Sequence, residues 1–569
     1  MKKILYTLTV AAAALLASCQ KPHYVLPTAE RAAFTSLSAY IVSGDYDGDE
    51  LAKLTVTDDM VRDGQLVIPV PYYYPETSEN STAKYMSELR IKAEIGVNCR
   101  ISPALTILDL DAENEFTFTD ADGKDWPIVI SGVRKKSDEA TFVSFSLVDM
   151  FEAFVDNEAR KIWLYTTDDL SSCTAEAEVS AHSSIVTDLS VPRNYNEPQT
   201  IVIASHSGKE HEYVTEKATP TKIRSGFNKE SVKQVFNFDP KSRLGTPDYF
   251  TADLYPALAL VGGYLVVYPG DGSTPFYLNG TTGAKIGDIA LGSVALGSLT
   301  NDEVGNMLLC NSLDGRGKLQ IYRTNSVTSA PTLFYEYDND IPLPVGRRIK
   351  VSGNIDGDAV ITLVYFGVSG VTQSSQFLSL TVKGGAVTDA EVIDLAPAEF
   401  LWGGDLSNSA GVVAASSDTQ NGYFSMYYDR VTLDYVDASG ALKASMPTSN
   451  GNSWGWNTNG LDCKLYNNVN YLAMMSFSHF PAWGISPTLY VYNVTDKTAL
   501  TGEFDSEENP ALVLSSEVSN SNKTNASATV SCGDIVIGQS ADGFKIFIYY
   551  YDQYAGAIGG YSADCIKRN

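Results

Sequence analysis

The sequence predicts an all-β protein with two N-terminal immunoglobulin-like β-sandwiches followed by a six-bladed β-propeller. Three observations support this prediction: the apolar segments are short and rich in Val, Ile, Leu and Tyr, one internal repeat covers the first part of the chain, and a longer repeat covers the rest. Short apolar segments bounded by turn residues are typical of strands. A chain of 569 residues exceeds one ordinary hydrophobic core, so we expect several domains.

The first nineteen residues carry an export signal. Lys2 and Lys3 precede a short apolar core at Ile4–Leu15, and Leu16-Ala-Ser-Cys19 follows. This resembles the lipobox of bacterial lipoproteins, which implies a signal peptide at residues 1–18 and acylation of the Cys19 thiol. The alternative is an ordinary signal peptide with a chance cysteine. Several acyl chains would anchor the protein stably, and no later segment is apolar enough to span a bilayer.

Residues 19–33 are expected to form a lipidated tether. Gln20 occupies the second position of the mature chain, where aspartate is the usual signal for inner-membrane retention. We therefore expect the outer membrane. The formal net charge of −27 disfavours a nucleic-acid partner, because such partners require a basic surface, and equally disfavours a polybasic membrane-surface role.

The N-terminal part contains two related segments. Phe116–Val129 aligns without a gap on Ile201–Val214, and each pattern indicates a strand, a Gly-Lys turn and a second strand. Phe34–Ser38 and Phe142–Ser146 match as opening strands. The middle strands are expected at Gln65–Pro71 and Lys161–Tyr165, and the sandwiches at 34–138 and 139–218.

The opening F-x-S-[LF]-S strand and the closing hairpin resemble the immunoglobulin-like repeats of Bacteroidetes lipoproteins, in particular the family called domain of unknown function 5018. The resemblance covers roughly the first two fifths of the chain. It implies a cell-envelope lipoprotein linked with glycan handling or adhesion. Surface export in that phylum usually follows an acidic stretch after the lipidated cysteine, and Gln20–His23 is not acidic. The cell surface and the periplasmic face both remain open.

The second repeat predicts a propeller at 219–569. Residues 250–569 divide into six units of about 53 residues, close to the ~50 of known blade repeats. Apolar strands recur at Tyr264–Val267, Met307–Cys310, Ala359–Leu363, Val412–Ala415, Tyr471–Met475 and Ile535–Ile537. Each has further strands around it, with Leu500–Phe504 expected as the outermost strand of the fifth unit. Val232–Asn237 would complete the last blade, and the alternative is a long stacked sandwich of hairpins.

Few residues suggest metal or cofactor chemistry. Only His479 of the five histidines lies in the propeller, which disfavours a transition-metal site, and no cofactor is predicted. Asp45, Asp47 and Asp49 resemble a calcium loop, although the glycine is misplaced for an EF-hand and the alternative is a solvated acidic turn. Six cysteines remain besides Cys19, and they are expected either as disulfides or as buried apolar residues.

Aromatic residues predict the binding face. Four of the six tryptophans fall between 402 and 483, in loops expected on one rim of the propeller. Flat rings amid Asn, Ser, Gly and Asp suit a sugar, whose C–H faces stack on them. The alternative is that the rings pack between blades. The predicted ligand-binding residues are Trp402, Trp454, Trp456, Phe480, Trp483 and Asp405.

The sequence therefore predicts a non-catalytic, lipid-anchored envelope protein that binds glycan or an envelope partner protein through one face of the propeller. Two alternatives stay open. The first is a propeller-type glycan hydrolase or lyase, for which carboxylates such as Asp405, Asp429 and Asp462 are available. The second is a structural or adhesive component without a small ligand.

Overall fold

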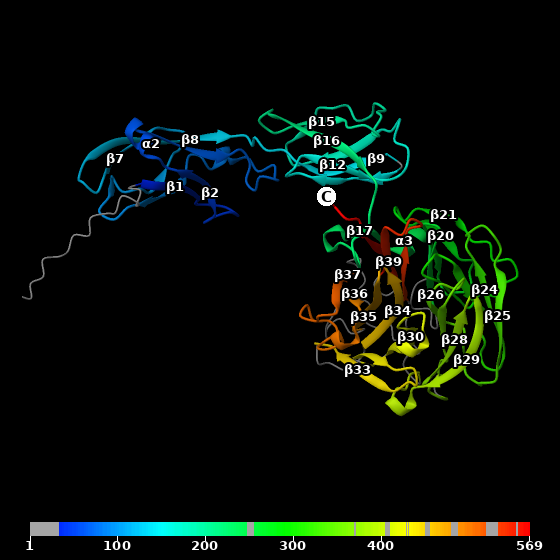
Figure 1. Ribbon diagram of the computed structural model, residues 1–569. Coiled ribbons are helices and arrows are strands. Elements are labelled where there is room, and N and C mark those ends of the chain that lie inside the picture. The colour runs from blue at the N-terminus through cyan, green and yellow to red at the C-terminus, as the bar shows by residue number, and fades with distance from the viewer. Residues whose placement is uncertain are drawn as a thin grey trace, which may run out of the picture. The chain divides into compact units, whose positions relative to one another are not determined.

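The computed structural model describes residues 34–148, 150–246, 255–368, 371–403, 410–427, 430, 432–449, 456–478, 487–518, 533–552 and 556–568. Within 456–478, side chains are described for residues 460–476 and the backbone alone for the others. The chain divides into two compact units, Met1–Pro220 and Thr221–Asn569. The sequence placed this boundary between residues 218 and 219. Strands dominate both units, and the fold is all-β (Figure 1).

The first sandwich packs the sheet β2-β1-β4-β6 on the sheet β3-β8-β7-β5. Its elements are β1 (Phe34–Ile41), β2 (Glu50–Thr55), α2 (Asp58–Asp63), β3 (Gln65–Pro71), η1 (Thr82–Lys84), β4 (Leu89–Ile95), β5 (Arg100–Ser102), β6 (Ile107–Leu108), β7 (Asn114–Thr119) and β8 (Asp125–Lys135).

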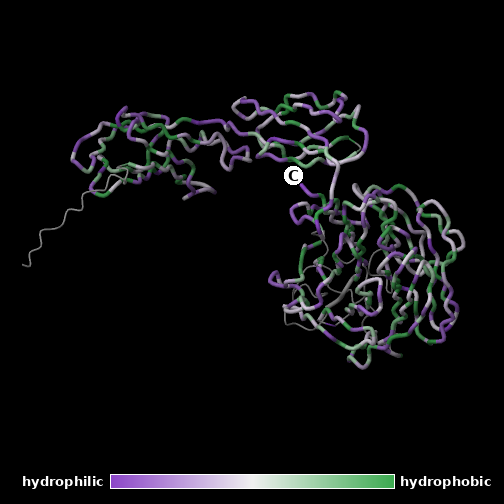
Figure 2. Tube along the Cα trace, in the orientation of Figure 1, coloured by the Kyte–Doolittle hydropathy of each residue, from purple (hydrophilic) through white to green (hydrophobic). Residues whose placement is uncertain are grey.

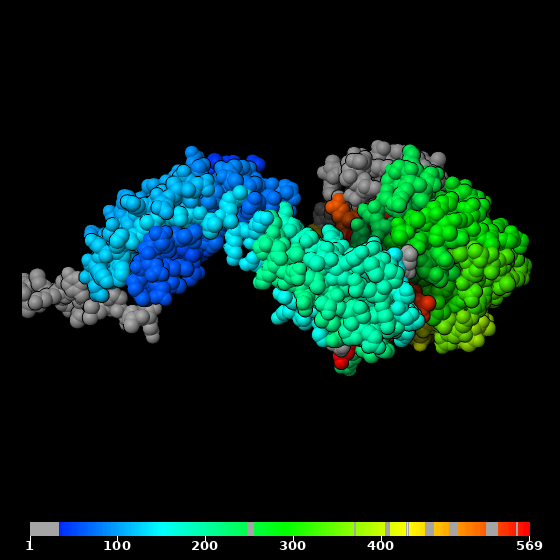
Figure 3. Space-filling model, turned by 90° about the horizontal axis from the view of Figure 1, so that it is seen from above, coloured from blue at the N-terminus to red at the C-terminus, as the bar shows by residue number. Residues whose placement is uncertain are grey.

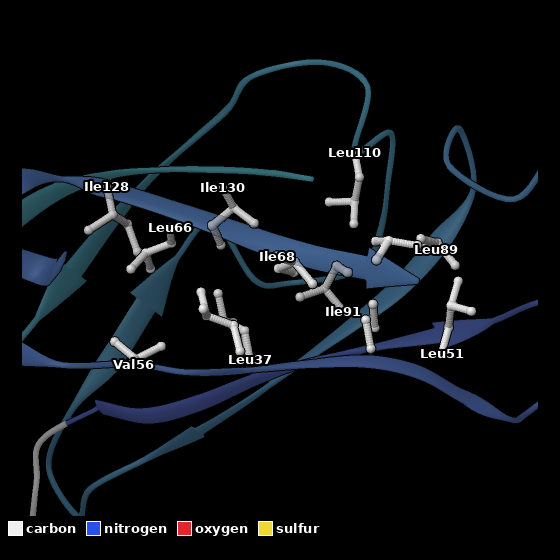
Figure 4. Close-up of a cluster of buried hydrophobic side chains, with 14 of the residues drawn as sticks. Leu37, Leu51, Val56, Leu66, Ile68, Leu89, Ile91, Leu110, Ile128 and Ile130 are labelled. Carbon is white, nitrogen blue, oxygen red and sulfur yellow. The ribbon is translucent and has the colours of Figure 1, made fainter. Parts of the chain in front are cut away.

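The core of this sandwich follows the two-residue period of its strands. Leu66, Ile68 and Val70 alternate along β3 and are completely buried, because successive side chains of a strand point to opposite faces. Figure 4 shows Leu37 of β1 on the other side of this core from Ile130 of β8. Burial of these side chains between the sheets is the main stabilising term of the module.

The second sandwich pairs the sheet β10-β9-β13 with the sheet β11-β12-β16-β15-β14. Its elements are β9 (Phe142–Leu147), β10 (Phe151–Glu152), β11 (Phe154–Asp156), β12 (Lys161–Tyr165), β13 (Ala175–Val179), β14 (Ser184–Ile185), β15 (Thr200–Ala204) and β16 (Glu210–Ala218).

The predicted repeat between the two sandwiches is confirmed. The closing hairpins are β7–β8 and β15–β16, and in each module the middle strand runs parallel to the last one, β3 beside β8 and β12 beside β16. Gly123 and Gly208 occupy the turns with φ values of 81° and 89°. Glycine adopts this left-handed region without a steric penalty, which explains the shared Gly-Lys turn.

The second unit is a β-propeller. The part of Thr221–Asn569 that the structure describes contains six four-stranded sheets, here called blades 1 to 6. Their innermost strands are β18, β22, β26, β30, β34 and β38, and each contacts the next around a closed ring. Figure 2 shows hydrophobic residues concentrated along the strands and hydrophilic residues at many of the turns.

The blades are formed by consecutive strands, with one exception in blade 6. Blades 1 to 3 are β18 (Ala257–Val261), β19 (Tyr264–Tyr268), β20 (Phe276–Asn279), β21 (Lys285–Asp288); β22 (Ser298–Asn301), β23 (Met307–Cys310), β24 (Gly317–Thr324), β25 (Thr332–Asn339); and β26 (Ile349–Gly353), β27 (Ala359–Val364), β28 (Gln376–Lys383), β29 (Ala386–Asp394). Blades 4 to 6 are β30 (Ala410–Ala414), β31 (Tyr423–Tyr427), β32 (Thr432–Val436), β33 (Leu442–Pro447); β34 (Trp456–Tyr466), β35 (Val469–Ser478), β36 (Thr488–Asn493), β37 (Leu512–Glu517); and β38 (Gly533–Gln539), β39 (Lys545–Asp552), β40 (Ala557–Asp564), β17 (Lys233–Phe238). The short helices are α3 (Pro240–Leu244), η2 (Lys229–Ser231), η3 (Ala396–Ala398), η4 (Thr419–Asn421) and η6 (Lys497–Ala499).

The exception closes the ring. β17 comes from the start of the unit and pairs antiparallel with β40, for example Phe236 with Gly560 and Phe238 with Ile558. The prediction that Val232–Asn237 completes the last blade is therefore confirmed. Backbone pairing thus joins the two ends of the unit in one sheet, with β17 as its outermost strand.

Three strand assignments were wrong. Leu500–Phe504 is not a strand, and the outer strand of blade 5 is β37. Leu500 and Phe504 are nevertheless buried in the core between blades, so an irregular segment carries an apolar pattern that indicated a strand. In blades 4 and 6, Val412–Ala415 and Ile535–Ile537 were aligned with second strands of other blades, whereas Val412 lies in the innermost strand β30 and Ile535–Ile537 in the innermost strand β38.

Candidate functional site

The predicted rim lies where the innermost strands begin. β34 begins at Trp456 and β35 ends at Ser478, and these two residues are direct partners in the antiparallel register. The start of β34 and the end of β35 are therefore neighbours in blade 5. Figure 1 shows β34 to β37 as one sheet of the propeller. Trp454, Phe480, Trp483 and Asp405 lie outside the described residues, and of Trp456 only the backbone is described.

Trp402 is not a surface residue, which corrects the prediction for this position. Its side chain is 1% exposed, and its Nε1–H donates to the carbonyl oxygen of Tyr365 at 2.8 Å. Its backbone pairs with that of Ser374, and its ring packs 5.7 Å from the ring of Tyr427. Trp402 therefore fills the core between blades 3 and 4. The misalignment of β30 explains the error, because it placed the start of the innermost strand near residue 402.

Two buried ion pairs occupy the axis of the propeller. Nζ of Lys350 in β26 lies 2.8 Å from Oδ1 of Asp534 in β38, on the opposite blade. Nζ of Lys464 in β34 lies 2.6 Å from Oδ1 of Asp462 and donates to the carbonyl oxygen of Val351. All four charged side chains are 7% exposed or less. Both pairs also hydrogen-bond to the backbone, as buried charges require.

The axial side chains join strands that share no backbone ladder. Asp534 Oδ2 accepts from the N–H of Leu258 in blade 1, and Asp462 Oδ2 accepts from the N–H of Ile537 in blade 6. Thr362 in blade 3 donates to the carbonyl oxygen of Val412 in blade 4. Innermost strands would otherwise leave backbone groups unpaired at the axis. These polar residues therefore hold the blades together.

The arrangement leaves little space beside the axial cations. Arg348, just before β26, donates to the carbonyl oxygen of Gly533 and lies 3.6 Å from Asp534. A cavity of about 10 Å³ is lined by Arg348, Lys350 and Thr362 among others. This volume suits at most one water molecule. The axial charges are thus engaged in structural contacts, and a larger ligand has no room there.

Glu303 lies where the innermost strands end, at the other end of the axis from Arg348. Its Oε1 accepts from the backbone N–H groups of Gly353 and Leu465, at 3.0 and 2.8 Å. It thereby connects the end of β22 with blades 3 and 5. Burial raises the pKa of Glu303, while these hydrogen bonds and the charge of Lys464 oppose the rise.

Sequence reasoning missed these axial residues, although a signal existed. Arg348 and Lys350 alternate with the apolar Ile349 and Val351 in a segment expected to be a strand. In a propeller, the innermost strand has one face toward each neighbouring blade and its edge on the axis. Charged residues on such a strand therefore indicate that they have partners at the axis. No pattern in a single sequence identifies Asp534 as the partner of Lys350.

The calcium prediction receives no support. Asp45, Asp47 and Asp49 lie in the turn between β1 and β2, and within the described ranges no group of three His, Cys, Asp or Glu residues could hold a metal ion. Oδ2 of Asp49 instead accepts a hydrogen bond from the hydroxyl of Tyr74. All three aspartates are exposed in this turn, and calcium binding there stays a prediction.

The cysteines of the described ranges are free thiols. They are Cys99, Cys173, Cys310, Cys463 and Cys565. Burial raises the pKa values of Cys310 and Cys463 to about 12, so neither thiol is a nucleophile at neutral pH. Among the helices of the described residues, none is long and apolar enough to cross a membrane.

Fold and axis together define the class of protein: two β-sandwiches in tandem with a β-propeller whose innermost strands are joined by buried ion pairs. The chain belongs to the family described as Domain of unknown function (DUF8500), whose model matches residues 235–564. The model Domain of unknown function (DUF5018) matches residues 14–132, and Domain of unknown function (DUF8499) matches residues 142–217. The predicted resemblance is thus confirmed for the first sandwich, whereas the second matches a different family model. No curated protein sequence matches the chain.

Several solved structures are similar at low identity. A DUF4623 family protein from Bacteroides eggerthii DSM 20697 is 16% identical, with a TM-score of 0.43 over 76% of this chain and 99% of its own. A protein from Bacteroides fragilis NCTC 9343 described as exported is 10% identical, with a TM-score of 0.29 over 60% and 97%. Virginiamycin B lyase from Staphylococcus aureus is 11% identical, with a TM-score of 0.28 over 58% and 99%. The architecture given above rests on the strand pairing of this chain itself.

Proposed function

We propose that this protein is a non-catalytic, lipid-anchored binding protein of the outer membrane, which binds glycan through the rim of blades 4 and 5. The observation that carries the proposal is the register of blade 5, in which Trp456 and Ser478 are partners. The strand ends that lead into the segments with Trp454 and Trp483 are therefore neighbours. Indoles attached to neighbouring strand ends can serve one sugar chain, because each ring offers a flat apolar face.

The axial ion pairs support a rim site over an axial one. Lys350–Asp534 and Lys464–Asp462 are buried ion pairs that also hydrogen-bond to the backbone, which disfavours these carboxylates and ammonium groups as ligand-binding groups. Asp462, one of the carboxylates considered for glycan hydrolysis, belongs to this network. Its engagement favours a binding protein over a hydrolase that would use this residue.

Binding by the rim is tested on a glycan array. The soluble chain from Gln20 is compared with its Trp454→Ala/Trp483→Ala variant and with Trp126→Ala, a tryptophan of the first sandwich whose Nε1–H donates to Asp120. The proposal expects bound glycans for the parent and for Trp126→Ala, and loss of these signals for the double variant. Equal binding by all three chains would exclude the rim, and no bound glycan at all would favour the structural component or a protein partner.

The lipid anchor rests on the lipobox at Leu16–Cys19, which lies outside the described residues. Metabolic labelling with an alkyne fatty acid tests it directly. The parent is expected to incorporate label and to fractionate with outer membranes, whereas Cys19→Ser is expected to remain unlabelled. Labelling of Cys19→Ser would contradict acylation at this residue. Protease treatment of intact cells then distinguishes the cell surface from the periplasmic face.

A further inference from the structure

The junction between the two sandwiches is held by specific contacts. The linker after β8 contributes two carbonyl groups: Ser137 accepts from the N–H of Ser207 at 3.0 Å, and Asp138 accepts from Nε2 of His211 at 2.7 Å. A third contact joins Nε2 of His182 to the carbonyl oxygen of Ser78 at 3.0 Å. Figure 3 shows the side chains of the first sandwich, in blue, continuing into those of the second, in cyan.

Aromatic rings from both modules meet at this junction. Tyr73 follows β3, and its ring stacks on the imidazole of His182 at 4.2 Å and on that of His206 at 5.5 Å. The two imidazoles are only 5.3 Å apart, so they lie on the same side of Tyr73. Tyr72 meets both Tyr73 and His206 edge-on. The opposite face of Tyr73 is therefore not covered by the two imidazoles.

A pocket of about 380 Å³ opens beside the rings. Its volume falls within the range of ordinary small-molecule sites. Both sandwiches and the linker contribute to its wall, which includes Pro71, Tyr72, Tyr73, Glu76, Lys136 and His206. Because the three junction hydrogen bonds fix these elements, the pocket is formed before any ligand arrives.

Several polar groups of the wall have no partner within the described residues. The hydroxyls of Tyr72 and Tyr73 and the ring nitrogens of His206 make no hydrogen bond there, and neither Lys136 nor Glu76 forms an ion pair. Burial, and then the positive charge of Lys136, lower the pKa of His206. A neutral imidazole has one donor and one acceptor nitrogen, so this wall presents both kinds of group side by side.

The charge of the wall indicates a neutral ligand. The wall includes the acidic residues Glu76, Asp138 and Glu139 and the basic residues Lys135 and Lys136, and Asp138 lies 3.3 Å from Lys135. The wall thus has no excess of positive charge, and the whole chain has a formal charge of −27. A sulfate, phosphate or carboxylate group would gain little here. Flat rings beside mixed donors and acceptors suit a ring with apolar C–H faces and hydroxyl groups at its edge.

We propose that the junction pocket binds a neutral saccharide, separately from the propeller rim. One face of the sugar stacks on Tyr73, and its hydroxyl groups bind Glu76, Lys136 and His206. Because both sandwiches supply contacts, the bound saccharide links them, and it stabilises the N-terminal unit in proportion to ligand concentration.

Isothermal titration calorimetry on the soluble full chain tests this proposal with cellohexaose, xylohexaose, mannohexaose and maltohexaose, and with hexagalacturonate as the acidic probe. At least one neutral hexaose is expected to bind. Glu76→Gln and Lys136→Met are each expected to weaken binding about tenfold or more, as for loss of a charged hydrogen bond. Both side chains are exposed, so the fold should persist. Glu113→Gln, an exposed glutamate of the same sandwich, is the matched control and should bind like the parent.

The Trp454→Ala/Trp483→Ala variant separates this site from the rim. The junction proposal expects the Glu76- and Lys136-dependent affinity to persist in that variant, whether or not the rim binds glycan. Three results would overturn it: no heat with any neutral hexaose, binding that neither Glu76→Gln nor Lys136→Met weakens, or binding of hexagalacturonate alone.

Discussion

Lys350 and Asp534 lie on innermost strands of opposite blades, with Nζ of the lysine 2.8 Å from Oδ1 of the aspartate. The lysine also donates to the carbonyl oxygen of Ile535, and the aspartate accepts from the N–H of Leu258. One buried pair therefore links blades 1, 3 and 6. A propeller has no hydrogen-bonded ladder between blades, so these contacts supply interactions that packing alone does not provide.

The first prediction concerns this pair. Asp534→Ala should lower the free energy of unfolding of the propeller by about 3–5 kcal/mol, because it leaves Lys350 buried without its counter-charge. Lys350→Met/Asp534→Leu should cost less than Asp534→Leu alone, since the ammonium group of Lys350 is removed together with its counter-charge and only Arg348 remains charged beside the site. Guanidinium unfolding followed by circular dichroism measures both differences.

An exposed pair provides the control. Lys383 and Asp358 lie 3.0 Å apart with about half of each side chain exposed. Lys383→Met should change the unfolding free energy by less than about 1 kcal/mol. If Asp534→Ala costs no more than this surface variant, the axial pair does not hold the blades.

The order of the two sandwiches and the propeller could be predicted because the sequence signals for their strands and turns are local. Each closing hairpin has its own Gly-Lys turn, and Val232–Asn237 has the apolar pattern of a strand that needs a partner. The pattern of apolar residues in a strand does not indicate whether that strand is the first or the second of its blade. For this reason β30 was assigned to the second position instead of the innermost one. Apolar loop segments such as Leu500–Phe504 fill a core without pairing, and their composition alone does not distinguish them from strands.

The candidate site was less predictable. Trp402 was expected on the rim because the innermost strand of its blade was placed near residue 402, but its large ring fills space between blades. Lys350 and Asp534 are 184 positions apart, and nothing local connects them. Likewise, Tyr73 and His206 belong to different modules, so their contact depends on how the two sandwiches are joined.

The second prediction is a pH effect at Glu303. Burial raises the pKa of Glu303. A carboxyl group with a raised folded-state pKa contributes stability below its ordinary pKa, and this contribution is lost as the pH rises through the raised value. Glu303→Gln keeps an Oε1 acceptor for Gly353 and Leu465 but does not ionise. From about pH 4 to about pH 8, the stability of the variant relative to the parent should therefore increase.

Denaturant unfolding at several pH values, with the transition of the propeller followed separately, measures this difference. Glu336→Gln, at an exposed position on the outer strand β25, controls for the general effect of removing one carboxylate. A constant difference between Glu303→Gln and the parent over the whole range would show that ionisation of Glu303 does not affect stability.

The third prediction concerns closure of the ring at Gly559. A methyl group at Gly559 would overlap the carbonyl oxygen of Phe236 in β17 and lie 2.5 Å from the hydroxyl of Tyr550. Gly559→Ala should destabilise the propeller by about 1–3 kcal/mol, as overpacking does. Gly357→Ala is the control, because its nearest neighbour would be 3.8 Å away. Equal midpoints of thermal unfolding for the two variants would contradict tight pairing of β17 with β40.

The last prediction separates packing from recognition at Trp402. Trp402→Ala should cost about 3–5 kcal/mol, because it removes a buried indole and the hydrogen bond to Tyr365. Trp402→Phe should cost less, since a ring still fills most of the space. Neither variant should alter glycan binding when measured below its unfolding transition, whereas Trp454→Ala should weaken binding and leave stability near that of the parent. Loss of binding by a fully folded Trp402→Phe protein would contradict a role in packing alone. It would indicate that Trp402 contacts the ligand, although its side chain is buried in this structure.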